Sequence, residues 1–85
     1  MSETEADRRR WQEWADEACA AVGVDPAQVD IRLVHALTKH VAHRLDRPLA
    51  PVSSYILGLA VAQGMDAAAA YEQLLSTLPT RSTEQ

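Results

Sequence analysis

The sequence predicts an all-α protein, a compact bundle of four short helices. Ala and Leu are common, whereas Gly (3), Pro (4) and aromatic residues (5%) are few, and this composition favours helices over strands. Apolar residues recur at steps of three and four along most of the chain. Because 85 residues suffice for one small domain, we expect a single helical domain over residues 7–79. The polar, unpatterned ends at 1–6 and 80–85 are predicted to be disordered tails.

The first helix is expected from about Asp7 to Val22, where Gly23 is suited to end it. Cys19 falls on its apolar side, and a single buried cysteine usually behaves as a small hydrophobic residue. Trp11 and Trp14 lie three residues apart, so both can join the core. Alternatively, they form an interface with another protein or with a second copy of the chain.

Asp25-Pro26 is expected to be a cap followed by a proline in the first position of a short turn. The second helix is then expected from about Ile31 to Asp46, after a second cap at Asp30. Two stripes of residues with helical spacing run along this helix. The apolar stripe, expected in the core, consists of Val34, Leu37, Val41 and Leu45. The basic stripe consists of Arg32, His35, Lys39 and His43. The basic stripe is either a functional surface or an ordinary solvated face.

Prolines separate the second helix from the third. The connector 47–51 contains two of them and is expected to be extended, because the residue before a proline is disfavoured in the helical region. Ser53 or Ser54 is then expected to cap the third helix. Residues 55–62 are apolar on every side, which predicts that this helix is the most buried of the four. Gly58 within it would let a neighbour approach closely.

The fourth helix is expected after Gly64, with Asp66 as its cap and with its end before Pro79. Its inward side chains are predicted to be Tyr71, Leu74, Leu75 and Leu78.

Charge is distributed unevenly along the chain. The formal net charge is −4, but residues 31–48 hold four Lys or Arg side chains against one acid, together with all three histidines. Such a segment could hold an anion or the acidic patch of a partner.

The candidate anion site is the start of the third helix. A helix N-terminus offers unpaired N–H groups and the positive end of the helix dipole, and it would combine here with His43, Arg47, Ser53 and Ser54. A phosphate or pyrophosphate would suit these groups. The structural alternative is that a serine only caps the helix, while His43 donates to a loop carbonyl and Arg47 pairs with a nearby acid.

Other function classes find little support in the residues. His40, His43 and Asp46 are too few to predict a metal site, and no orienting carboxylate accompanies a serine and a histidine, so we expect no enzyme, no catalytic residue and no cofactor. The third helix is too apolar to read DNA, and the net negative charge argues against nucleic acid as a partner. The single cysteine, and the absence of a signal peptide or a membrane span, predict a cytoplasmic protein.

A resemblance to a known family covers Trp14 to about Leu78. It rests on Val41-Ala42-His43, Arg47-Pro48, Ala50-Pro51, Ser53-Ser54, Tyr55 and Leu57-Gly58, preceded by the Trp-rich first helix and Gly23-Val24-Asp25. In these residues the chain resembles DUF6457, a small actinobacterial domain of unknown function. Members of that family stand alone or follow a molybdenum cofactor guanylyltransferase, and some are linked to formate dehydrogenase accessory proteins. His40 departs from the family pattern, which has an acidic or neutral residue there.

The resemblance implies a role close to molybdenum cofactor maturation and supplies no catalytic residue. Together with the small size, it predicts a non-enzymatic binding or adaptor module. Its partner would be a molybdenum cofactor or formate dehydrogenase maturation enzyme, or a second copy of the chain. The alternative is a small-ligand binder that holds a phosphate-bearing pterin or nucleotide at the start of the third helix.

Overall fold

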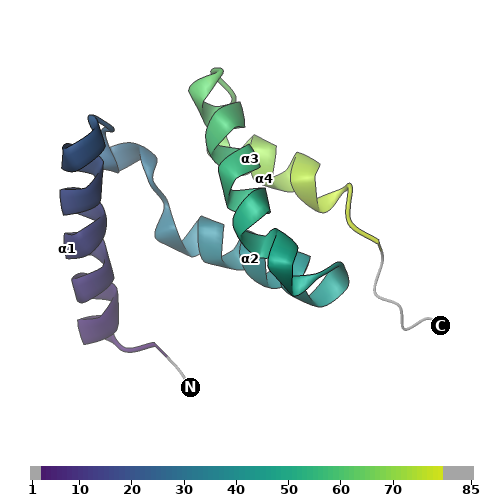
Figure 1. Ribbon diagram of the computed structural model, residues 1–85, viewed down its shortest axis with the longest axis horizontal. Helices are drawn as coiled ribbons and strands as arrows, with labels where there is room; N and C mark the ends of the chain where they lie inside the picture. Colours follow the sequence, from purple (N-terminus) through teal and green to yellow (C-terminus); the bar gives the residue numbers. More distant parts are fainter. Residues whose placement is uncertain (1–2, 80–85) are drawn as a thin grey trace. The chain divides into compact units, whose positions relative to one another are not determined.

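A computed structural model describes residues 3–79, and within them every regular element is helical (Figure 1). The α-helices are α1 (Glu5–Val22), α2 (Ile31–Arg44), α3 (Ala50–Ala62) and α4 (Ala67–Leu75), and the short 3-10 helices are η1 (Pro26–Gln28) and η2 (Arg47–Leu49). The all-α class and the four helices predicted from the sequence are confirmed. The predicted C-terminal tail, residues 80–85, lies outside the described residues.

The chain divides into two compact units. Unit 1 is Met1–Ile31 and holds α1 and η1, and unit 2 is Arg32–Gln85 and holds η2, α3, α4 and nearly all of α2. A single domain over residues 7–79 stays a prediction.

Helix α1 begins two residues earlier than expected, at Glu5, so Glu5 and Ala6 of the predicted tail are helical and Thr4 caps the helix. Thr4 and Asp7 form a reciprocal capping box. The Asp7 N–H donates to Thr4 Oγ1 over 3.0 Å, and the Thr4 N–H donates to Asp7 Oδ2 over 3.1 Å. Two N–H groups that the helix leaves without a partner are satisfied in this way.

The capping box makes the start of α1 sensitive to acid. The Thr4 N–H, the largest cause, and the Arg10 guanidinium hold the pKa of Asp7 below its usual value. The bond therefore supports the helix above the ordinary carboxyl pKa of about 3.9, and this support is lost as the pH falls through the lower pKa of the folded state. We expect NMR titration of the Asp7 carboxyl to give a pKa below about 3.9 and the Thr4 amide shift to follow it. A value at or above the ordinary one would contradict the capping box.

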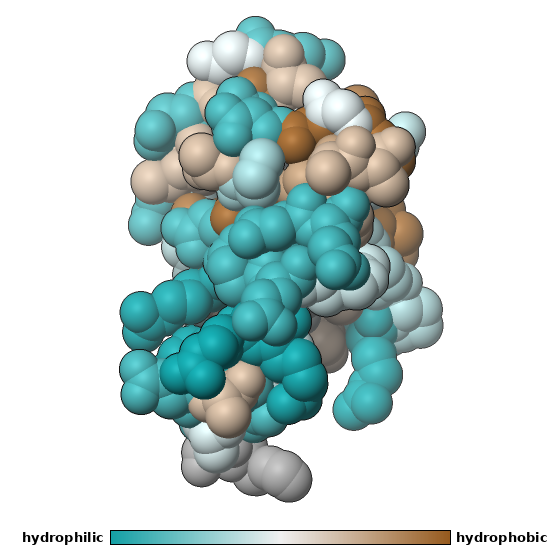
Figure 2. All heavy atoms as spheres, turned by 90° about the vertical axis from the view of Figure 1, so that its left-hand side faces the viewer, coloured by the Kyte–Doolittle hydropathy of each residue, from teal (hydrophilic) through white to brown (hydrophobic). Residues whose placement is uncertain are grey.

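Two further expectations for unit 1, the roles of Gly23 and Asp25, are confirmed. Gly23 ends α1 with φ 74°, a left-handed conformation that glycine adopts without strain. The Val24 N–H donates to the Cys19 carbonyl over 2.8 Å. Asp25 caps η1 through the Ala27 N–H, also as predicted. Figure 2 faces α1, whose visible surface is largely hydrophilic.

The core of unit 2 joins three helices. Leu37 and Val41 of α2 meet Leu57 of α3 and Ala70 of α4, and Leu37 is fully buried. The predicted inward side chains of α4 pack against this cluster, together with Leu33, Val34, Ala60 and Val61. Asp66 caps α4 by accepting from the Ala69 N–H over 3.1 Å, as expected. Helices α3 and α4 are in contact.

Between α2 and α3 the structure differs from the expectation. Helix α2 ends at Arg44, and η2 occupies part of the connector that was expected to be extended. The Leu49 N–H donates to the Asp46 carbonyl over 3.0 Å, which closes this short turn. Ala50 has helical angles (φ −57°, ψ −50°) although a proline follows it. Pro51 lies in the first turn of α3, where its fixed φ favours the helix and its missing N–H costs nothing.

Helix α3 is not buried on every side, and the prediction that it is the most buried helix is not confirmed. Its inward side holds the buried residues Ser53 and Leu57. Tyr55 and Leu59, on the opposite side, are 70% and 46% exposed. Only one side of α3 faces the core that it shares with α2 and α4, so its uniform apolar composition leaves apolar side chains in solvent.

Candidate functional site

Unit 2 carries an open apolar groove of about 260 Å³. Its walls come from the end of α2, from η2, from one side of α3 and from the end of α4. The groove is lined by Val41, Leu45, Leu49, Val52, Ser53, Ile56, Leu74, Thr77 and Leu78. Seven of these nine side chains are aliphatic, and no charged residue is among them. Leu45 and Val52 are about half exposed (51% and 47%), so the groove is accessible from solvent.

The two hydroxyl groups of the groove already donate to carbonyls of the chain. Ser53 Oγ donates to the Ala50 carbonyl over 2.6 Å, and Thr77 Oγ1 donates to the Leu74 carbonyl over 2.7 Å. Because each hydroxyl has a single proton, neither has one left to donate to a ligand while these bonds are kept. The groove therefore lacks the convergent polar donors that fix the orientation of a small polar molecule.

Arg44 positions one wall of the groove. Its Nε donates to the Pro79 carbonyl over 3.0 Å, and its Nη2 lies 3.5 Å from the Leu78 carbonyl. These bonds tie the end of α2 to the segment after α4, and Leu78 of that segment lines the groove. Arg44 is one of the four Lys or Arg residues of segment 31–48. These bonds give it a structural role.

We expect Arg44→Ala to lower the free energy of unfolding by about 1 kcal/mol, because two partly exposed hydrogen bonds are replaced by bonds to water. Urea unfolding followed by circular dichroism measures the change. Arg47→Ala serves as the control, because Arg47 is an exposed surface residue for which we expect less than about 0.5 kcal/mol. Equal losses in the two variants would contradict the structural role of Arg44.

The predicted anion site lacks the geometry on which it rested. Helix α3 begins at Ala50 with Leu49 at the cap position, so Ser53 and Ser54 lie inside the helix and not at its N-terminus. Ser53 is buried, and its hydroxyl donates to the Ala50 carbonyl. The prediction that either serine caps this helix is wrong. Sequence reasoning placed the cap at the hydroxyl pair, whereas the helix starts one turn earlier, around Pro51.

The other two residues of that site, His43 and Arg47, are exposed, His43 on α2 and Arg47 in η2. Whether they bind an anion stays a prediction. The basic stripe is exposed as a whole: Arg32, His35, Lys39 and His43 lie on the side of α2 opposite the buried Leu37 and Val41. It forms one continuous face of basic residues.

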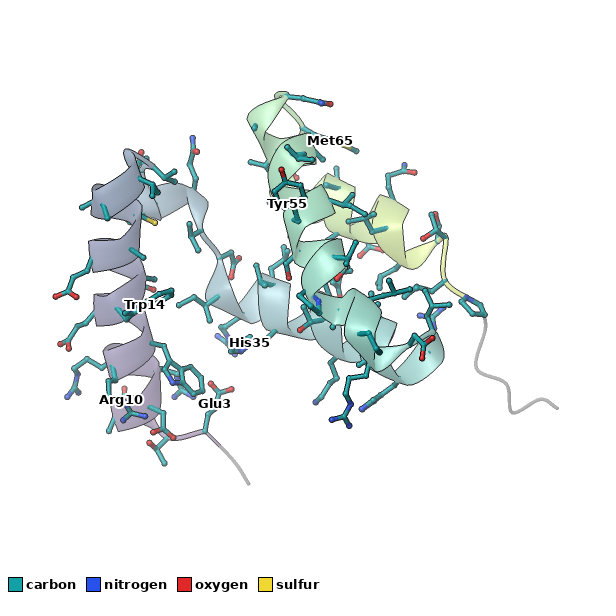
Figure 3. The ribbon with its side chains drawn as sticks, viewed as in Figure 1. Glu3, Arg10, Trp14, His35, Tyr55 and Met65 are labelled. Carbon is teal, nitrogen blue, oxygen red and sulfur yellow. The ribbon has the colours of Figure 1, made fainter. Side chains whose placement is uncertain are left out.

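The two tryptophans of α1 differ in exposure. Trp11 is partly buried, whereas Trp14, labelled on α1 in Figure 3, is 68% exposed, so the expectation that both join the core is wrong for Trp14. An exposed tryptophan is unusual on a surface that contacts only water, and tryptophan is enriched where proteins bind one another. Trp14 is therefore a second candidate contact, on unit 1. Cys19 is buried, on the side of α1 that the sequence predicted.

Sequence reasoning missed the groove because Leu45 was assigned to the core. Its position in the apolar stripe fits that assignment, but α2 ends at Arg44, and Leu45 follows the helix with half of its surface exposed. The signal that could have revealed this is Pro48, since helices commonly end a few residues before a proline.

Over residues 3–79, no group of three or more His, Cys, Asp or Glu side chains is placed to hold a metal ion. No helix in the same range is both long and apolar enough to cross a membrane.

Comparison with known proteins gives one match. A family model described as a domain of unknown function, DUF6457, matches residues 6–85. Neither the curated proteins nor the solved structures contain a match.

Proposed function

Starting from the fact that the chain belongs to the DUF6457 family, we propose that it is a non-enzymatic adaptor whose groove in unit 2 holds apolar side chains of a partner protein. The observation that carries the proposal is the groove itself. It is open and aliphatic, and both of its hydroxyl groups already donate to backbone carbonyls. Apolar grooves recur in protein recognition, where they hold the apolar side chains of a partner.

The size of the groove fits side chains better than a cofactor. Its volume of about 260 Å³ lies below the ~300 Å³ at which pockets for drug-sized ligands begin. A cavity of ~150 Å³ is sufficient for one benzene ring, so the groove has room for one or two large apolar side chains. An amphipathic helix that presents such residues is a common occupant of an apolar groove.

The class of partner comes from the family resemblance. We expect a molybdenum cofactor guanylyltransferase or a formate dehydrogenase maturation protein to supply the apolar side chains. Trp14 on unit 1 would add a further contact.

Isothermal titration calorimetry against the purified guanylyltransferase tests the proposal, and a parallel titration with GTP tests the alternative. We expect heat and saturation with the protein. With GTP we expect no change in the NMR signals of His43, Arg47, Ser53 and Ser54. Shifts of these four residues with GTP that vanish in Arg47→Ala, together with no binding of the protein, would favour the ligand alternative and contradict the adaptor.

A further inference from the structure

Gly58 lies in the middle of α3, and the packing of its own chain gives no reason for a glycine there. Its backbone is helical, and a Cβ added to it would meet nothing within 4 Å. Glycine in a helix interior costs about 1 kcal/mol relative to alanine. Close approach of a second backbone is one reason for a glycine, and the open space beside Gly58 leaves room for another helix.

The side chains around Gly58 form an outer face of α3 in which large and small residues alternate. We define this outer face as Tyr55, Gly58, Leu59 and Ala62, all four of which are exposed. Figure 3 labels Tyr55 on α3. None of the thirteen residues of α3 is charged. The outer face shares no residue with the groove.

We infer that this outer face pairs with the same face of a second copy, with the two α3 helices antiparallel around a two-fold axis between Gly58 and Leu59. Such an axis places Leu59 opposite Gly58 of the partner subunit, and Tyr55 opposite Ala62 of the partner subunit. Each large side chain thereby meets a small one. This self-complementarity is what a two-fold symmetric interface requires, and it singles out a second copy over an unrelated protein.

The distribution of charge favours α3, and not α2, as the helix that pairs with its copy. Two-fold pairing sets identical surfaces against each other, so the basic stripe of α2 would oppose like charges, which destabilises an interface. The outer face of α3 has no charge to repel its copy.

The exposed area sets the expected strength of the dimer. With Tyr55 70% and Leu59 46% exposed, the outer face offers on the order of 400 Å² per copy. Two copies bury less than the ~1,200 Å² at which stable interfaces begin. The dimer is therefore expected to be weak, because interfaces of this size lie at the low end of the range for specific complexes.

Sedimentation velocity of the full chain between about 10 µM and 1 mM, a range suited to a weak dimer, tests the inference. The mass should rise from one chain toward two. Gly58→Leu should stay monomeric over the range, because the new side chain fills the space that Leu59 of the partner subunit would occupy. Its thermal midpoint should be unchanged or raised, since leucine is a better helix former and nothing within its own chain is displaced.

Ala68→Leu, which adds the same side chain at an exposed position of α4, is the matched control and should dimerise like the original chain. A chain that stays monomeric at 1 mM would overturn the inference. So would a Gly58→Leu variant that keeps its fold and still dimerises. Neither result bears on the groove, because the inference does not rest on the adaptor function.

Discussion

Leu37→Ala is expected to unfold most of unit 2 at moderate temperature. Leu37 is the one fully buried large side chain among the described residues, and it contacts a cluster drawn from all three helices of the unit. Truncating such a residue costs the transfer free energy of the lost atoms and leaves a cavity, about 3 kcal/mol in total. A core this small supplies only ~3–5 kcal/mol of net stability, so the loss is comparable to the whole.

Thermal unfolding followed by circular dichroism at 222 nm measures this effect. Leu45→Ala is the matched control, because Leu45 is 51% exposed and its truncation should cost less than about 1 kcal/mol. If the two variants melted together, the core of unit 2 would have to lie elsewhere.

Leu45→Glu is expected to weaken partner binding by about 30-fold, which corresponds to about 2 kcal/mol. Leu45 lines the groove, so an apolar side chain of the partner would bury the new carboxylate without an ion to pair with it. The free protein should tolerate the change, because the side chain is half exposed.

Val22→Glu provides the comparison for this prediction. Val22 is an apolar residue of α1 that lies outside the groove and is more exposed (74%) than Leu45 (51%). We expect the affinity of the Val22→Glu variant for the partner, measured by calorimetry, to match that of the original chain. An equal loss in both variants would mean that added negative charge alone weakens binding and that the groove is not the site.

Local sequence rules predicted the ends of several elements. Each of these ends depends on a hydrogen bond to a residue a few positions away, at Gly23, Asp25 and Asp66. The residue type and its sequence neighbours were therefore sufficient to predict each cap. Thr4 acts in the same way, and its spacing to Asp7 matches a capping box. The cap at Thr4 was not predicted, because the residues around Thr4 lack the apolar periodicity by which helices are recognised.

The start of α3 set two rules in conflict. The rule for residues before proline disfavours helical angles at Ala50, whereas proline itself is favoured in a first helical turn. The second rule prevailed, so α3 begins at Ala50 and Ser53 is inside the helix. This shift of one turn removed the basis of the predicted anion site.

The groove and the outer face of α3 could not be derived from pattern alone. An apolar helix shows no preferred side in its sequence, and which side faces solvent depends on how many helices surround it. The core of unit 2 forms on one side of α3, so Tyr55 and Leu59 remain exposed. Composition thus predicted an apolar α3, while tertiary packing determined which of its side chains reach solvent.

NMR mapping of the groove tests the central claim, that this chain is an adaptor that binds through unit 2, most directly. Methyl signals of Leu45, Val52 and Leu78 are followed as the purified molybdenum cofactor guanylyltransferase is added. The account predicts that these signals shift or broaden with saturation, while those of the exposed Val22 on α1 stay in place. Unchanged groove signals at saturating partner would contradict it.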